Sequence, residues 1–453
     1  MKELLLIILM LGLPGGLLAE HRIDRPNTDK GFVTVHYPEG FDPARRYDLL
    51  FWFHGTGGSP NPGIGRRHEG FVTVGMSYLK RDHVPAGDDG GAHWQECLAV
   101  RQELETQRVK LDRNLVAGMS KGGWMSFYIA AKAREGLHAV GIFAAGKDPN
   151  TKEVDNLEGQ GLSVLVGTGE TDPNFPQAQL AVKILKAAGA TVFYEEWLGE
   201  GHTYHSDGRV RHWLDVESRR TQAEELRRFC DEAIDAELQR VEEWALAKDR
   251  YVALRRLVGD PRLAEASETL RVRVRDLGTA LAGEPAVEEW RLGLAKLRAL
   301  VGREAEFFNR RDFAVSKLDK LVAAYQKLLG EVGHPDLAAR AAYGYRRATK
   351  MLAIYTAQMK ARENPEYQAL TKEYVQLQTK FGETGGKPGE DVMQRLQEVG
   401  ARLGELRHAA SMGAFHEAES GKAAGRDIPE VTAAIEAAAA DSGRPQASGG
   451  LGF

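Results

Sequence analysis

The residues with the clearest chemical potential lie in the stretch NLVAGMSKGGWMSFYIAA, residues 114–131. After Asn114 it opens with the apolar, β-inclined run Leu115-Val116-Ala117, whereas the segment from Trp124 onward is rich in helix formers and has no breaker. Ser120 therefore lies where a strand becomes a helix, and Gly118 and Gly122 flank it at the spacing G-x-S-x-G. Such glycines permit a tight turn that exposes the serine hydroxyl as a nucleophile. A plain strand-to-helix turn would show the same pattern, so the partners of the serine must decide.

A serine that attacks a carbonyl group needs hydrogen-bond donors for the resulting oxyanion. Upstream, the apolar run LLFWF leads directly into His54-Gly55-Thr56-Gly57-Gly58. A glycine-rich loop at the end of a strand lets backbone N–H groups approach a ligand oxygen. We expect Thr56 or Gly57 to supply one donor and Lys121 the other. His54 precedes the serine in the chain, so we expect it to order this loop or to line the substrate site, and not to act as the base.

The serine also needs a base and a carboxylate that orients the base. The strand in LSVLVGTGETDPNFP ends in an acidic loop, and a turn at its DPN sequence would hold a carboxylate at the edge of the sheet. Asp172 is the expected acid, with Glu170 of the same loop as the alternative. The strand in VFYEEWLGEGHTYH is followed by a glycine and His202. His202 is the expected base, with the nearby His205 as the alternative.

Three further side chains are candidates for substrate contacts. Lys121 places a cation beside the expected oxyanion site, and we expect it to favour an acidic substrate unless it points into solvent. Trp94, in the cluster DDGGAHWQE, could stack on an aromatic or sugar ring, or pack in the core at the start of a helix. Trp124 is the third candidate for a substrate-lining residue.

The elements around these residues alternate between short β-inclined runs and helical runs from about residue 31 to residue 212. Glycines separate them, as is typical of a parallel sheet covered by helices. We expect strands at 32–35, 49–53, 71–75, 115–117, 140–143, 163–166 and 191–195. We expect helices at 94–109, 124–134 and 176–188.

After Trp213 the chain changes to charged stretches with helical periodicity. Apolar residues recur at steps of three and four through 226–244 and again through 313–329. Glycine and proline breakers at 259–261, 283–285, 333–335 and 364–365 divide the region into helices. We therefore expect an α/β domain at 20–216, a domain of antiparallel helices, in the manner of helical hairpins, at 217–436, and a disordered tail at 437–453.

The phrases VHYPEGFDPARRYDLLFWFHGTGGS, GFVTVGMSY, LDRNLVAGMSKGGWMSFYIAA and VLVGTGETDPN together carry a family resemblance. The region from about residue 31 to residue 212 resembles the α/β-hydrolase superfamily. It is similar in particular to secreted esterases of the polyhydroxybutyrate depolymerase, feruloyl esterase and acetyl-xylan esterase type. The resemblance implies an α/β-hydrolase fold and ester hydrolysis through an acyl-serine, with Ser120 as nucleophile, His202 as base and Asp172 as orienting acid. It does not extend to the helical second half.

Composition and the N-terminus limit the other classes of function. The 453 residues contain 60 basic and 64 acidic side chains, a near balance that argues against binding to nucleic acid. Residues 1–19 combine Lys2, a short apolar run and a small residue before Glu20, which predicts a signal peptide and a secreted or periplasmic protein without stable membrane insertion. The two cysteines, Cys97 and Cys230, are expected to be packed residues or a single disulfide, and no metal-ligand spacing is evident.

The sequence therefore predicts an exported serine hydrolase that cleaves a small or polymeric carboxylic ester without a cofactor. Two alternatives use the same fold. One is a catalytically silent hydrolase-fold protein whose helical domain binds a protein partner or a second copy of the chain. The other is a serine peptidase, which would use the same triad with a different pocket.

Overall fold

The computed structural model describes residues 20–66, 68–85, 88–132, 136–147, 161–197, 199–309, 315–383 and 389–419, and residues 430, 433, 434 and 436. The described residues up to 309 belong to one compact unit, and those from 315 onward belong to a second. The predicted signal peptide and the predicted disordered tail lie outside the described residues. None of the helices that the structure describes is long and apolar enough to span a membrane.

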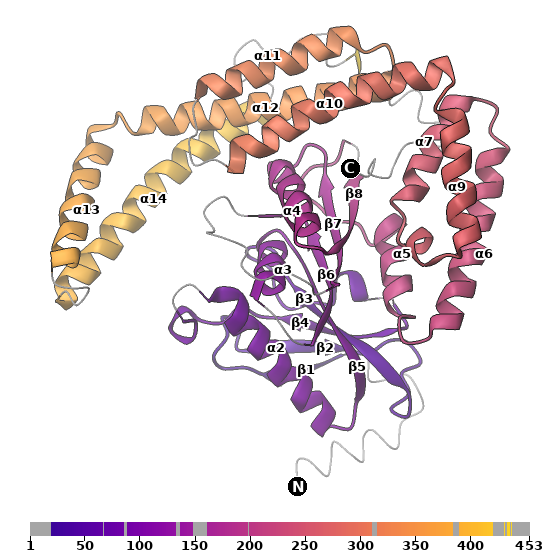
Figure 1. Ribbon diagram of the computed structural model, residues 1–453. Coiled ribbons are helices and arrows are strands. Elements are labelled where there is room, and N and C mark those ends of the chain that lie inside the picture. The colour runs from indigo at the N-terminus through magenta and orange to yellow at the C-terminus, as the bar shows by residue number, and fades with distance from the viewer. Residues whose placement is uncertain are drawn as a thin grey trace. The chain divides into compact units, whose positions relative to one another are not determined.

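An eight-stranded sheet forms the centre of the first unit (Figure 1). Its strand order is β1-β2-β4-β3-β5-β6-β7-β8, in which β2 is antiparallel to both neighbours and β3 to β8 run parallel. The strands are β1 (Glu20–Asp24), β2 (Phe32–His36), β3 (Arg46–Phe53), β4 (Phe71–Met76), β5 (Lys110–Met119), β6 (Leu137–Phe143), β7 (Ser163–Gly169) and β8 (Thr191–Trp197). All seven expected strands are present. The short polar strand β1 was not expected, because it carries too few apolar residues to show a pattern.

Helices cover both faces of this sheet (Figure 1). On one face, two apolar clusters join the sheet to α2 (Asp89–Thr106), α3 (Lys121–Lys132) and α4 (Phe175–Ala187). On the other face, a third cluster joins it to α5 (Gly208–Glu217). Two short 3-10 turns, η1 (Gly63–Gly65) and η2 (Arg81–His83), lie in the connections around β4. The predicted fold class is confirmed: a mostly parallel sheet flanked by helices, followed by a helical region.

The next helices of the chain belong to the same unit as the sheet. They are α6 (Ala223–Glu242), α7 (Ala247–Val258), α8 (Pro261–Glu265), α9 (Glu268–Leu281) and α10 (Pro285–Asn309). On α5, Arg209 donates to the carbonyl oxygen of Arg256 at 3.1 Å, and His212 lies 2.8 Å from the Asp260 carboxylate. The sequence placed every helix after residue 216 in one domain, whereas these contacts bind α7 and α8 to α5. The breakers at 259–261 and 283–285 end and begin helices as expected.

The second unit consists of α11 (Val315–Glu331), α12 (Pro335–Ala361), α13 (Pro365–Glu383) and α14 (Glu390–Glu419). Within it, α12 packs against α11 and α14, and α13 packs against α14. Arg395 of α14 pairs with Glu373 of α13 at 2.6 Å, and Arg402 pairs with Glu366 at 2.9 Å. The later arginine on α14 pairs with the earlier glutamate on α13. The two helices are therefore antiparallel, as predicted for this region.

The crossing of β5, β3 and α3 is the tightest backbone approach around the candidate serine. A β-carbon on Gly122 would lie 1.9 Å from the carbonyl oxygen of Phe53, and one on Gly118 would lie 2.5 Å from the backbone of Gly122. Real β-carbons do not come this close to backbone atoms, so only glycine fits at either position. The two glycines of the G-x-S-x-G pattern therefore set the distance between the first turn of α3 and the ends of the strands.

We expect Gly122→Ala to lower the unfolding free energy of the first unit by about 3 kcal/mol or more, since the obstructing atom is backbone and cannot rotate away. All seven tryptophans precede residue 310, so urea unfolding followed by tryptophan fluorescence reports on this unit. Gly278→Ala is the matched control, because the space around Gly278 in α9 is open. It should leave the stability unchanged or raise it by up to about 1 kcal/mol. Equal stability of Gly122→Ala and wild type would contradict the close approach.

Candidate active site

Ser120 occupies a backbone conformation that few residues other than glycine adopt. Its φ angle is 58°, in the left-handed region. It follows the last residue of β5 directly and precedes the first residue of α3, so the chain reverses its course at this one residue. The backbone N–H of Ser120 donates to the carbonyl oxygen of Phe143 at 2.9 Å, which fixes the turn to the end of β6. Strained residues of this kind gather at functional sites, where the surrounding structure holds them.

The carboxyl ends of the parallel strands bring the predicted site residues to one edge of the sheet. Phe53 of β3 pairs with Gly118 of β5, and Met119 pairs with Phe143 of β6. Farther along the same edge, Gly169 of β7 pairs with Trp197 of β8. The chain leaves this edge after β3, β5, β7 and β8 in the segments 54–58, 120–121, 170–174 and 199–207. Open α/β sheets bind ligands at this edge.

Asp172 is held in a turn directly after β7. Its side chain is fully buried, its backbone N–H donates to the Gly169 carbonyl at 3.1 Å, and one carboxylate oxygen accepts the N–H of Asn174 at 2.8 Å. This is the turn that the DPN sequence predicts. A buried carboxylate needs partners that favour its charge, and the second partner of this one is an imidazole.

His202 approaches both oxygens of that carboxylate. Its Nδ1 atom lies 3.1 Å from each oxygen of Asp172, and 39% of the His202 side chain is exposed. The hydrogen bond to Asp172 raises the pKa of His202 above its ordinary value, against the lowering effect of partial burial. Because the carboxylate only accepts, Nδ1 carries the proton that it shares with Asp172. The neutral ring then has its free lone pair on Nε2, as a general base requires.

Aromatic contacts hold the loop that carries His202 across the sheet edge. The ring of Tyr204, two residues farther on, lies 5.1 Å from the ring of Trp52 and 6.4 Å from that of Phe143. Trp52 belongs to β3 and Phe143 to β6, the two strands that flank β5. The loop after β8 therefore reaches back over the strand that ends at Ser120.

No hydrogen bond joins the Ser120 hydroxyl to His202 in the part of the chain that the structure describes. Catalytic hydrogen bonds are often long without substrate and shorten in the complex. The structure thus brings Asp172 and His202 into contact and places Ser120 at the same edge, half-buried, without closing the serine–histidine bond.

The two alternatives for the acid and the base have other surroundings. Glu170 is buried, and its backbone N–H donates to the Trp197 carbonyl at 2.9 Å. The ring of His205 packs against the ring of Trp197 at 5.1 Å, and its Nε2 atom is buried without a hydrogen-bond partner among the described residues. The geometry therefore favours Asp172 and His202 for the two roles.

The loop after β3 presents backbone donors next to the serine. Gly58 donates to the Gly55 carbonyl at 3.1 Å, and Gly57 has a φ angle of 76°, which together define a tight turn. A β-carbon on Gly55 would lie 3.5 Å from the β-carbon of Ser120. Within the described segments, the backbone N–H groups of Thr56 and Gly57 donate to no protein acceptor, as expected of donors that face a ligand. The N–H of Lys121 opens α3, where the helix itself provides no acceptor.

Three predicted side chains around these donors occupy defined positions. His54 is buried, and its Nδ1 lies 2.7 Å from the Gly55 carbonyl, so it orders the loop. Trp94 is buried in the core at the start of α2, with its ring edge-on to Phe51, which is the core-packing alternative. Trp124 is half-buried and donates from Nε1 to Gln177 of α4 at 3.1 Å.

Lys121 does not extend freely into solvent. Its Nζ atom lies 3.7 Å from the centre of the Tyr78 ring, an arrangement that attracts a cation to the aromatic face. The side chain is nevertheless exposed, and no carboxylate lies within ion-pair distance of it among the residues described. Tyr78 is the residue near the site that the sequence reasoning missed. A tyrosine just after a buried strand, in the phrase GFVTVGMSY, was the available signal.

Within the part of the chain that the structure describes, the cysteines and the potential metal ligands form no site of their own. Cys97 and Cys230 are both buried free thiols, so the single disulfide considered from the sequence is not formed. Nowhere in the described ranges do three or more His, Cys, Asp or Glu side chains gather as metal ligands would.

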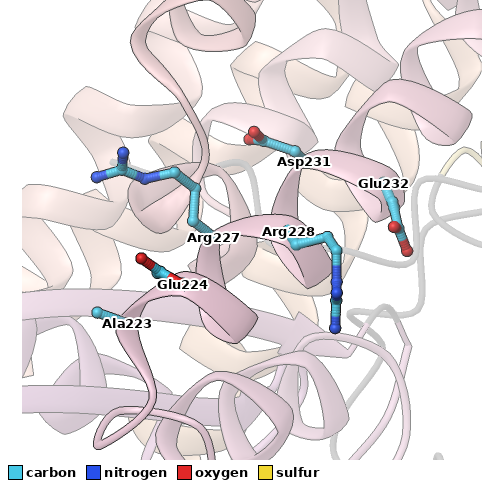
Figure 2. A pocket seen from close by; sticks show the side chains of 6 residues that line it. All are labelled: Ala223, Glu224, Arg227, Arg228, Asp231 and Glu232. Carbon is cyan, nitrogen blue, oxygen red and sulfur yellow. The ribbon is translucent and has the colours of Figure 1, made fainter.

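A hollow of about 440 Å³ is lined by residues of α6 (Figure 2). Figure 2 shows that its lining residues are Ala223, Glu224, Arg227, Arg228, Asp231 and Glu232. This lining of two arginines and three carboxylates contains no serine, cysteine or histidine. This hollow has no part in the candidate site.

Part of the chain matches a known protein family. Residues 28–215 match the family described as "Putative esterase". No curated protein matches the chain.

Solved structures with a similar fold include a thermostable esterase, with a TM-score of 0.31 and 17% identity over 39% of this chain and 53% of that chain. An esterase of Pyrobaculum calidifontis has a TM-score of 0.33 and 18% identity over 49% of this chain and 86% of its own. The feruloyl esterase module of Clostridium thermocellum has a TM-score of 0.32 and 15% identity over 42% of this chain and 84% of its own. The chain thus spans about half the length of the first of these structures. Similarity this distant says nothing about what this chain binds or hydrolyses.

The strand order, the G-x-S-x-G turn and the family match coincide on the same segment of the chain. Residues 28–215 therefore match the esterase family, over a domain that has the α/β-hydrolase fold.

Proposed function

We propose that this domain hydrolyses carboxylic esters through an acyl-serine intermediate, with Ser120 as nucleophile, His202 as base and Asp172 as the acid that orients it. The observation that carries the proposal is the contact of His202 Nδ1 with both oxygens of the buried Asp172 carboxylate, at the sheet edge where the strained Ser120 lies. A histidine–carboxylate pair alone does not mark a base, since His212 and Asp260 form one elsewhere, and it is the strained serine at the same edge that supports this role for His202.

The proposed reaction proceeds in two acyl transfers. In the first, Ser120 Oγ attacks the ester carbonyl carbon while its proton passes to Nε2 of His202, and the tetrahedral oxyanion accepts hydrogen bonds from the N–H of Lys121 and of Thr56 or Gly57. The C–O bond to the alcohol then breaks, and His202 returns the proton to the leaving oxygen. In the second transfer, water attacks the acyl-serine with the same base, which releases the acid and restores Ser120.

The first alternative function differs from this proposal because the protein would not turn over a substrate. The second differs in the pocket that binds the substrate. A silent hydrolase-fold protein would keep the turn at Ser120 without an activated hydroxyl, and the helices of the second unit would then carry a function in binding a protein partner or a second copy. A serine peptidase would use the same residues on an amide. The order of the loop after β3, Ser120, Asp172 and His202 along the chain favours ester hydrolysis over a silent fold.

The proposal that the protein is exported rests on the sequence of residues 1–19 alone. A charged residue, a short apolar run and a small residue before Glu20 are typical of a cleaved signal peptide. We propose a secreted or periplasmic enzyme whose mature chain begins at Glu20.

Replacement of the nucleophile tests the proposal directly. Ser120→Ala should lower kcat on p-nitrophenyl acetate by at least about 10³-fold, because only binding and the oxyanion donors remain. Ser126→Ala is a matched control: Ser126 lies in α3, the helix that follows Ser120, is fully buried, and donates to the Gly122 carbonyl at 2.9 Å. It should retain activity. Equal activity of Ser120→Ala and wild type would exclude Ser120 as the nucleophile.

The pH dependence of kcat/KM tests the base and its acid. His202 must be neutral to accept a proton, so activity should rise with pH through a His202 pKa that Asp172 holds above its ordinary value. Asp172→Asn removes the interactions that raise this pKa and leaves the lowering effect of burial. The acidic limb should therefore move to lower pH, while kcat falls by about 10³- to 10⁴-fold. Glu170→Gln should leave the limb in place. If Glu170→Gln moved the acidic limb and Asp172→Asn left it in place, Glu170 would be the acid.

The cation beside the site leads to a prediction about substrate charge. We expect Lys121 to favour esters with an anionic group, since its ammonium is exposed and held at one place by the Tyr78 ring. Lys121→Met should lower the rate on 4-acetoxybenzoate relative to its neutral methyl ester by about two- to fivefold, as expected for one exposed charge. The ratio should also fall in wild type as salt is raised. An unchanged ratio would show that Lys121 does not select substrate charge.

A further inference from the structure

Tyr78 makes contacts that neither the proposed reaction nor the packing of the core requires. It follows β4 by two residues and is only 3% exposed. Its hydroxyl donates to the backbone carbonyl oxygen of His54, a contact between two different connections of the sheet. Burial raises the pKa of Tyr78 above its usual range, so the hydroxyl keeps its proton and remains a donor.

On one side, Tyr78 contacts the loop with the expected oxyanion donors. Its ring lies 5.0 Å from the His54 ring, nearly perpendicular to it at 87°. Nδ1 of His54 lies 2.7 Å from the Gly55 carbonyl, which also accepts the N–H of Gly58 at 3.1 Å. A carbonyl only accepts, so His54 donates from Nδ1. Two bonds converge on Gly55 and hold the turn that presents Thr56 and Gly57, and Tyr78 holds the residue before it.

On the other side, Tyr78 contacts the segment with the nucleophile. The face of its ring binds the ammonium of Lys121, the residue that follows Ser120 and supplies the second expected donor. The carbonyl oxygen of His54 that accepts the Tyr78 hydroxyl also lies against α3: a β-carbon on Gly122 would be 3.0 Å from it. The loop and the first turn of α3 therefore meet at the group that Tyr78 binds.

The backbone of Tyr78 is itself fixed. Its N–H donates to the Asp29 carboxylate at 3.0 Å, and its carbonyl accepts the N–H of Asp29 at 2.7 Å. The rings of Phe53, at 5.7 Å, and of His93, at 6.0 Å, pack around its side chain. Because both its backbone and its ring are fixed, Tyr78 can hold the groups that it binds at a fixed distance from each other.

We propose that Tyr78 is a positioning residue that holds the two donor segments of the oxyanion site, His54 to Gly58 and Ser120 to Lys121, at a fixed separation. The inference rests on the proposed function for the identity of the site, and it assigns Tyr78 no contact with the substrate. The hydroxyl sets the position of the loop, and the face of the ring sets the position of Lys121.

Tyr78→Phe removes the hydroxyl and keeps the ring. We expect kcat on p-nitrophenyl acetate to fall about tenfold with KM changed less than about twofold, because misplaced donors weaken transition-state binding and leave ground-state binding intact. Tyr37→Phe is the matched control. Tyr37 is also buried, and its hydroxyl has no hydrogen-bond partner in the described part of the chain. It should leave both kinetic constants unchanged.

Hydrogen exchange followed by mass spectrometry gives a readout that does not need turnover. In Tyr78→Phe, peptides that carry the hydrogen-bonded amides of Gly58 and Ser120 should exchange faster than in wild type, with the rest of the sheet unchanged. Lys121→Met, an exposed change that does not threaten folding, should speed exchange in residues 119–122 only. Unchanged exchange in both variants, or an unchanged kcat in Tyr78→Phe, would overturn the inference. A wild type that hydrolyses no ester would contradict the proposed function, and exchange would still decide the role of Tyr78.

Discussion

The close approach of α3 to the ends of β3 and β5 is the constraint on which the candidate site depends. Ser120 has a φ angle of 58°, a conformation that costs a residue with a side chain on the order of 1–3 kcal/mol. Because Gly118 and Gly122 have no side chains, α3 can begin directly against the Phe53 carbonyl. A side chain at either position would have no room there. The sheet supplies the energy that keeps the turn in place, since β5 lies between β3 and β6 in a buried parallel array. A looser crossing would remove both the strain and the exposure of the hydroxyl.

The parallel sheet then determines which other residues can reach this serine. Segments that follow β3, β7 and β8 leave the sheet at the same edge as β5, so a loop of backbone donors, an acid and a base converge although about 150 residues separate the first from the last in the chain. Burial distinguishes the proposed acid from the proposed base. Asp172 is fully enclosed, whereas His202 is partly exposed, as a group that exchanges protons with a substrate must be.

Much of this arrangement could be predicted from the sequence because it follows from local patterns. Apolar runs ended by glycine mark the strands, the G-x-S-x-G spacing marks the turn, and breakers such as Gly333-His334-Pro335 mark the ends of helices. Contacts across the fold could not be predicted in this way. The Tyr78 hydroxyl meets His54, and Asp260 meets His212, only because the tertiary structure brings separate connections together. The attachment of α7 and α8 to α5 depends on such contacts, and so does the choice of Asp172 over Glu170.

The location of a covalent adduct is the most direct test of whether Ser120 is an activated nucleophile. The chain from Glu20 to Phe453 would be treated with a fluorophosphonate, digested and mapped by tandem mass spectrometry. We expect a single phosphonylated serine, Ser120, and loss of the adduct when the protein is unfolded before treatment. A folded protein without an adduct, or with the adduct on another serine, would contradict it.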